Sequence, residues 1–334
     1  MSLLHAYRLQ HNLRRFALSH PESFSVGAEV GSGRRLWDRA VISHVLPVPV
    51  TSHVEVYTSP DRSLARYGNL IDANSWRSPV SAYYKSREMV RRLEFCSSLA
   101  RRSGLTPHMI TLTLRHSRAD SLASVLQILR DAWAWFSSGG WWSSHRPTLP
   151  VVRRLEITYS AANGWHPHLH LLCFFSASPD VSAWRARWVA AVQRFGGDAL
   201  PGVGLDVRVS DDAVSSYVSK LHLEMASPLS KSGGLSIYAM LEDPDRYAPQ
   251  VCEYYAATRR VRFVGGVSQL MRALGVSDSD IPADDSVGWM LCLSLTRDQY
   301  MRLVDLHLVV DFLVYCLSSP DPAFTLYMQC IAVS

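Results

Sequence analysis

Apolar and polar positions alternate with a period of two in three segments of the chain, which is typical of half-buried strands. These segments are residues 108–116, 151–159 and 165–175. The third begins with alternation and ends in a fully apolar run, as a buried strand does. The turn residues Asn163 and Gly164 separate the second segment from the third, so we expect the two to pair as an antiparallel hairpin.

Elsewhere apolar positions recur every three or four residues, which predicts helices. The predicted helices cover residues 79–102, 119–137, 181–195 and 210–225. Residues 288–317 form an apolar tail that we also expect to be helical. Residues 1–74 show little periodicity and are interpreted as a poorly defined N-terminal arm.

Three histidines occupy alternate positions of the third strand: His166, His168 and His170. Alternate side chains of a strand share a face, so His168 and His170 are expected to project together. Two imidazoles side by side in an apolar wall suit a divalent metal. The alternative is one hydrogen-bonded core histidine with the others at a strand edge. If the register of the predicted hairpin puts Glu156 on the same face as these histidines, its carboxylate joins the two imidazoles as a metal ligand. A register shifted by one residue would leave Glu156 as an exposed strand residue.

The predicted helix 210–225 has a polar edge beside its apolar stripe. At about 100° per residue, Tyr217, Lys220 and Glu224 lie on one flank of this helix. One interpretation is an amphipathic tyrosine beside a solvated lysine and glutamate. The histidine strand that precedes this helix favours a functional edge instead.

The composition of the chain excludes several kinds of protein. Among 334 residues, 34 are Lys or Arg and 29 are Asp or Glu, which gives a net charge of +5. Six scattered cysteines include no Cys-x-x-Cys pair, which argues against a disulfide framework and a cysteine-based zinc module. The N-terminus lacks the apolar core of a signal peptide, and Leu303–Leu317 is short and contains aspartates. We therefore expect a cytoplasmic protein that does not contact a membrane.

Arginines cluster at several places, and their planar guanidinium groups match phosphates. The clusters considered for DNA binding are Arg153 with Arg154, and Arg259 with Arg260 and Arg262. Aromatic residues lie beside the second cluster, as in segments that stack on bases and pair with phosphates. The alternative is that these charges are simply solvated.

Several motifs, in this order, carry a family resemblance: Thr111-Leu-Thr, Glu156-Ile-Thr, His166-Pro-His-Leu-His170, Tyr217-Val-Ser-Lys220 and Glu253-Tyr-Tyr-Ala-Ala-Thr-Arg-Arg260. Together they resemble the replication initiator (Rep) proteins of rolling-circle plasmids. Those proteins belong to the HUH endonuclease superfamily, which is named for its His-hydrophobic-His motif. The similarity covers about residues 75–317.

The resemblance implies an α+β fold. A central antiparallel sheet would carry the His-hydrophobic-His strand, with helices on its flanks and a helical C-terminal region. It also implies a domain division: residues 1–74 as the arm, residues 75–275 as the HUH endonuclease and origin-binding domain, and residues 276–334 as a helical extension.

The implied reaction is the nicking of one DNA strand at a plasmid or phage origin. Tyr217 would attack a phosphodiester, forming a 5′-phosphotyrosyl link and freeing a 3′-hydroxyl that primes rolling-circle replication. The metal would be Mg²⁺ or Mn²⁺ on His168, His170 and Glu156, polarising the scissile phosphate. Lys220 would steady the phosphate or lower the tyrosine pKa, which is near 10 in a free side chain.

The resemblance also implies accessory roles and partners. His166 and Glu224 are accessory candidates, and the partners would be origin DNA together with a host helicase and polymerase. Some relatives carry a glutamate one turn before the tyrosine that activates water at termination, but Ala213 stands there and Glu224 lies about 10 Å along the axis. The paired cysteines of other relatives are missing from Ser75–Ser81, so we expect no structural zinc there.

Two other functions compete with nicking. A histidine-triad nucleotide hydrolase or transferase fits His166-Pro-His-Leu-His170 if Pro167 counts as apolar, with His168 as nucleophile and no metal. That alternative leaves Tyr217 and the arginine clusters unexplained. A non-catalytic origin-binding protein with a decayed site is the other alternative. Relaxases and transposases of the same superfamily share the chemistry, but the absence of a second tyrosine beside Tyr217 disfavours a two-tyrosine enzyme.

Overall fold

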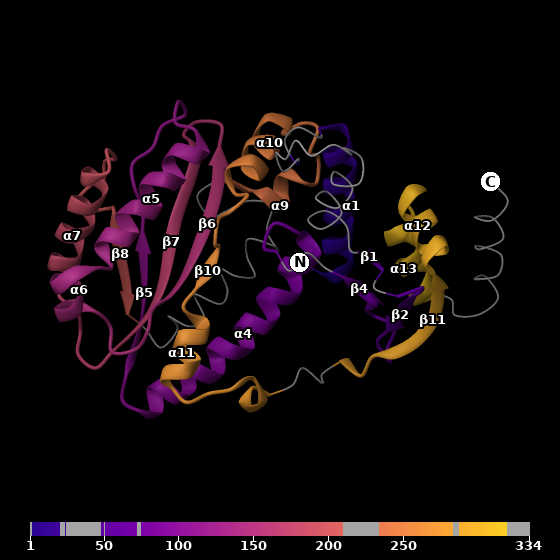
Figure 1. Cartoon of the computed structure of the whole chain (residues 1–334), viewed down its shortest axis with the longest axis horizontal. Helices are drawn as coiled ribbons and strands as arrows, with labels where there is room; N and C mark the ends of the chain where they lie inside the picture. The colour runs from indigo at the N-terminus through magenta and orange to yellow at the C-terminus, as the bar shows by residue number, and fades with distance from the viewer. Residues whose placement is uncertain are drawn as a thin grey trace, which may run out of the picture. The chain divides into compact units, whose positions relative to one another are not determined.

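A computed structural model describes residues 2–20, 24, 48–49, 51–71, 75–209, 234–282 and 287–318. The chain divides into two compact units (Figure 1). The first unit comprises residues 1–85, 241–248 and 283–334, and the second comprises residues 86–240 and 249–282. No helix among the described residues is both long and apolar enough to cross a bilayer.

The second unit contains a six-stranded sheet in the order β10-β6-β7-β5-β8, with β9 pairing on β6, and every pair is antiparallel. Its strands are β5 (Thr106–Leu112), β6 (Val152–Ser160), β7 (Gly164–Phe175), β8 (Leu205–Val209), β9 (Leu235–Ser236) and β10 (Val264–Gly265). The long strands β6 and β7 form a hairpin in which Ser160 lies opposite Gly164. Gly164 has a φ of +75°, a conformation that favours glycine and lets the chain reverse.

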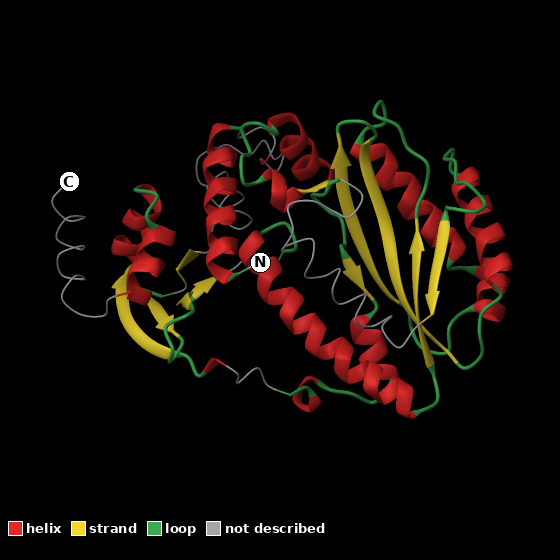
Figure 2. Cartoon of the chain, turned by 180° about the vertical axis from the view of Figure 1, so that it is seen from behind, coloured by secondary structure: helices red, strands yellow, loops and turns green. Residues whose placement is uncertain are grey.

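Helices complete this unit: most of α4 (Pro79–Arg102), α5 (Leu122–Phe136), α6 (Gly139–His145), α7 (Val181–Arg194), α9 (Ile237–Met240), α10 (Ala248–Ala257), α11 (Val267–Ala273) and the 3-10 turn η1 (Asp278–Asp280). Helix α5 runs along one face of the sheet (Figures 1 and 2) and contacts β7 and α7. Ser121 caps α5 by accepting a hydrogen bond from the Ser124 amide. The buried ring of Phe136 on α5 packs against the buried rings of Trp184 and Trp188 on α7.

The first unit is built on the antiparallel sheet β11-β2-β3. Its elements are α1 (Leu3–Ser19), β1 (Val48–Pro49), β2 (His53–Thr58), β3 (Ala65–Gly68), β4 (Leu70–Ile71), β11 (Met290–Thr296), α12 (Arg297–Asp305) and α13 (Val309–Ser318). Helix α13 contacts α1, β2 and β3, and its Phe312 is fully buried. The unit thus joins residues from both ends of the chain in one core.

The α+β class, the central antiparallel sheet with the histidine strand and the helical C-terminal region are confirmed. Two local predictions differ from the structure. The N-terminal arm contains α1, whose one-sided apolar stripe is buried, and the four strands β1 to β4, of which β2 and β3 belong to the sheet with β11. Residues 290–296, expected as part of a helical tail, form β11, because an apolar run of this length does not by itself distinguish a strand from a helix.

Candidate metal centre

The register of the β6–β7 hairpin places a carboxylate and two imidazoles on one face of the sheet. Glu156 lies directly opposite His168, and Arg154 lies opposite His170. Directly paired residues project to the same face, so Glu156, His168 and His170 point together while Leu155, Leu169 and Leu171 point to the α5 side. The register that the sequence left open is therefore the one that joins Glu156 to the histidines.

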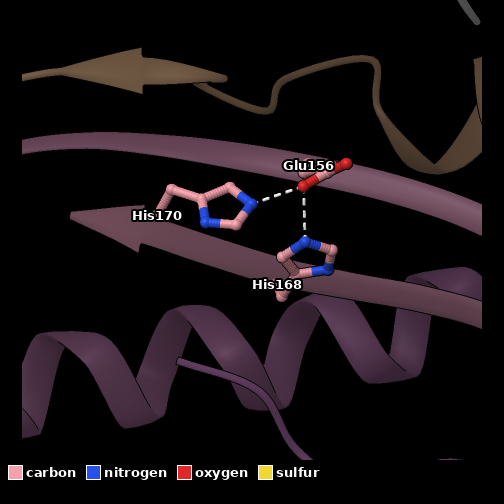
Figure 3. A group of neighbouring side chains, drawn as sticks. All are labelled: Glu156, His168 and His170. Atoms are coloured by element: carbon pink, nitrogen blue, oxygen red, sulfur yellow. Dashed lines mark hydrogen bonds and ion pairs between the residues drawn. The ribbon is translucent and has the colours of Figure 1, made fainter. Parts of the chain in front are cut away.

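The three side chains converge on one point (Figure 3). The Oε2 atom of Glu156 lies 2.5 Å from Nε2 of His168 and also contacts Nε2 of His170. One ligand atom from each residue lies within 4.8 Å of the other two. The group is enclosed, since His170 is 1% exposed and His168 is 9% exposed.

The electrostatics of the group favour a charged carboxylate. Burial by itself would raise the pKa of Glu156, but the hydrogen bonds and charges of His168 and His170 outweigh burial and hold this pKa well below its usual range. One carboxylate oxygen and two imidazole nitrogens are a common donor set for divalent cations such as Mn²⁺, Fe²⁺ or Zn²⁺, and Mg²⁺ accepts the oxygen more readily than the nitrogens. The residues therefore fit a divalent metal.

A hydroxyl on the neighbouring strand orients one of the imidazoles. Thr111 of β5 lies opposite His170, and its Oγ1 is 3.1 Å from Nδ1 of that ring. If Nε2 of His170 is the metal-binding atom, Nδ1 carries the proton and donates a hydrogen bond to Oγ1 of Thr111, which orients the ring. Nδ1 of His168, by contrast, is buried and has no hydrogen-bond partner within the described part of the chain.

The third histidine belongs to a different pair. Nδ1 of His166 lies 2.5 Å from Nε2 of His116, whose Nδ1 is 3.0 Å from the carbonyl oxygen of Asn163. Burial, followed by the charges of His168 and His116, lowers the pKa of His166 to about 4, so this ring is neutral at pH 7. The pair lines a cavity of about 310 Å³ together with Thr113, Arg115 and Ser160.

The residues proposed for catalysis in segment 210–225, Tyr217, Lys220 and Glu224, lie outside the described residues. The arginines considered for DNA binding do not all lie together in the structure. Arg154 is buried on the histidine face, whereas Arg153, Arg260 and Arg262 line one cavity on the α5 side of the same sheet. Arg259 is half-buried and does not line that cavity.

The sequence prediction named neither Thr111 nor His116 as a site residue. Thr111 was visible only as part of a family motif, and its role depends on the pairing of β5 with β7. These strands are far apart in the sequence, so no turn signal fixes their register. His116 follows β5 closely, but its contact with His166 also depends on that pairing.

Comparison with known proteins gives one distant similarity. The chain is 23% identical over 267 residues to "Protein rep" of Streptomyces lividans, an alignment that covers 54% of this chain and 59% of that protein. The chain thus matches about three-fifths of the length of this relative. No protein-family model matches the chain, and no solved structure does. The similarity is consistent with a Rep-type replication protein.

Proposed function

We propose that this protein is a replication initiator that nicks one strand of a plasmid or phage origin by metal-dependent tyrosine transesterification. The observation that carries the proposal is the convergence of Glu156, His168 and His170 on one point of a largely buried sheet face. The distant similarity to "Protein rep" and the order of the sequence motifs support it.

Tyr217 is the proposed nucleophile. Its phenolic oxygen loses its proton and attacks the scissile phosphorus, the phosphorus–O3′ bond breaks, and the 3′ oxygen takes up one proton to leave as a 3′-hydroxyl, while the 5′-phosphate stays on the tyrosine. Glu156, His168 and His170 would hold a divalent cation, which would supply the Lewis acid that polarises the phosphate. Lys220 balances charge on the phosphate, and Glu224 is the accessory carboxylate.

The remaining parts of the site have supporting roles. Thr111 holds the ring of His170 with Nε2 directed at the carboxylate of Glu156, which makes Thr111 a positioning residue. The cavity beside His116 and His166 is large enough for one base of the bound strand and lies next to the histidine strand. Arg154 adds a positive charge on the same sheet face, where a scissile phosphate would lie. Host helicase and polymerase are the expected partners after nicking.

The test is the capture of a covalent DNA–protein product. The protein would be incubated with Mn²⁺ and a library of randomised single-stranded oligonucleotides, separated on a denaturing gel, and the attached strands sequenced. A shifted band that is lost in Tyr217→Phe, in His168→Ala/His170→Ala and with a chelator supports the proposal. Tyr247→Phe and His145→Ala are matched controls that keep the band.

The same experiment separates the competing functions. Hydrolysis of nucleotide phosphoramidates that survives Tyr217→Phe and is lost in His168→Ala would contradict nicking and assign the chain to the histidine-triad enzymes. DNA binding with no covalent band on the library or on supercoiled plasmid would indicate the non-catalytic origin-binding protein.

A further inference from the structure

A second cavity, of about 330 Å³, opens on the α5 side of the sheet, on the opposite face from the metal centre. Its floor is apolar, with four buried leucines, and its rim is cationic. The floor is formed by Leu126, Leu129, Leu155, Leu169 and Ala257, and the rim by Arg130, Arg153, Arg260 and Arg262. We call it the arginine cavity.

Three of its four guanidinium groups have no acidic partner among the described residues. Arg130 is paired with Asp131 at 3.7 Å, but no described carboxylate forms an ion pair with Arg153, Arg260 or Arg262. Gly265 explains how two of them come together, because a Cβ atom there would lie 3.2 Å from Nε of Arg153 and 3.7 Å from Cδ of Arg262. Burial lowers the pKa of Arg153, and the charge of Arg262 lowers it further. The cavity therefore gathers positive charge that the described part of the protein does not neutralise.

The backbone holds these arginines in place. The amide of Leu155 donates to the carbonyl of Phe263 at 2.7 Å, and Arg153 pairs with Gly265 across β6 and β10. Gly266 has a φ of +94°, and a Cβ atom there would lie 1.9 Å from the carbonyl oxygen of Val151, so only glycine fits. Arg153 thus lies on a strand of the sheet, and the segment that carries Arg260 and Arg262 is joined to that strand through the backbone, which reduces the entropic cost of binding an anion.

We propose that the arginine cavity binds one nucleotide of a single-stranded DNA segment, with the base on the leucine floor and the flanking phosphates on the arginines. An apolar floor with a cationic rim matches a base and its phosphates. The guanidinium groups lie on two sides of the cavity. Arg130 comes from α5, and Arg260 and Arg262 come from the segment before β10. A single phosphate does not require arginines on both sides, whereas successive phosphates of one strand do. The choice of DNA as ligand rests on the proposed function, whereas the site itself uses neither the metal residues nor Tyr217.

The test is binding of a fluorescein-labelled dT12 oligonucleotide to Tyr217→Phe protein in a chelator, read by fluorescence anisotropy over a range of salt concentrations. Arg260→Gln/Arg262→Gln should weaken binding by at least about tenfold and reduce the salt slope by about 0.7 for each phosphate that the variant no longer neutralises. Ala257→Phe fills the floor without changing charge, and should weaken binding by roughly tenfold with the slope unchanged. Arg272→Gln, an exposed arginine outside the cavity, is the matched control and should leave both quantities close to those of the parent.

Three outcomes would overturn the inference: an effect of Arg272→Gln equal to that of the double variant, wild-type binding by Ala257→Phe, or dTMP binding as tightly as dT12. Thermal denaturation shows that each variant folds. Failure of this inference is distinguishable from failure of the proposed function. If the covalent band is absent while the cavity variants behave as expected, the proposed function fails and the cavity stands. If the band forms and the variants bind normally, only the cavity assignment fails.

Discussion

The two faces of the central sheet use the same strands for different purposes. On one face, β6 and β7 present Glu156, His168 and His170, and on the other they present Leu155, Leu169 and Leu171 to α5. The polar face is enclosed yet carries a carboxylate whose charge is stabilised by its histidine neighbours. The apolar face supplies the packing that fixes the register. Because side chains alternate along a strand, each leucine that is buried correctly also positions a histidine.

The largest expected effect comes from removing the charge on the polar face. Glu156→Gln keeps the shape of the side chain but loses the anionic ligand, so Mn²⁺ affinity should fall by more than the roughly 100-fold that loss of an outer-shell partner costs. The measurement is the free Mn²⁺ signal in electron paramagnetic resonance during a titration. Glu94→Gln, an exposed glutamate on α4, is the control. Unchanged Mn²⁺ binding in Glu156→Gln would contradict the metal assignment.

A change on the apolar face should act on stability and spare the metal. Leu171 is fully buried next to His170 in the sequence, and Leu171→Ala should cost roughly 2–5 kcal/mol of the free energy of unfolding through the cavity it leaves. Urea denaturation measures this, with the exposed Leu200→Ala as control. If the folded variant also loses Mn²⁺ affinity by as much as Glu156→Gln, the two faces are not separate in function.

A smaller effect is expected from the residue that orients His170. Thr111→Val removes the hydroxyl that lies 3.1 Å from Nδ1 and should lower Mn²⁺ affinity by about 10- to 100-fold, while the overall stability changes little. Thr111→Ser should restore affinity because it restores the hydroxyl. Thr113→Val, two residues along the same chain, serves as the control. A Thr111→Val protein with normal affinity, or one that serine does not rescue, would count against the positioning role.

The smallest effect concerns a histidine outside the metal centre. Burial, followed by the His307 ring, lowers the pKa of His11 to about 4. The unfolded chain, with a histidine pKa near 6.5, then binds more protons than the folded chain between pH 6.5 and 4, so stability falls as the pH decreases through this range. For a half-buried ring we expect roughly 1–2 kcal/mol after screening by solvent.

Hydrogen exchange of the α1 amides at several pH values measures this loss. His11→Gln should remove most of the pH dependence between pH 6.5 and 4, and His53→Gln, which is exposed, should not. An identical pH profile in His11→Gln would show that another group titrates in this range.

Local patterns in the sequence were sufficient to predict the two strands that carry the candidate metal ligands. The alternation in residues 151–159 and 165–175, together with the turn at Asn163-Gly164, predicted the β6–β7 hairpin, and the α+β class followed from the family resemblance. These features depend on neighbours in the chain, where periodicity and turn chemistry act directly. The N-terminal helix α1 was missed although its apolar stripe is a local signal, whereas the strand β11 was missed because its partner β2 lies near the opposite end of the sequence.

Only the tertiary structure decided which polar residues meet. From the sequence, Glu156 could lie near His168 only if the two strands of the hairpin paired in the right register. The structure shows that register, with Glu156 directly opposite His168. The contacts of Thr111 with His170 and of His116 with His166, and the pairing of Arg153 with Gly265 beside Arg262, all join segments that are distant in the chain. Such pairings are fixed by the burial of the whole apolar face rather than by any local signal, since a shift of one residue would expose every leucine that now lies under α5.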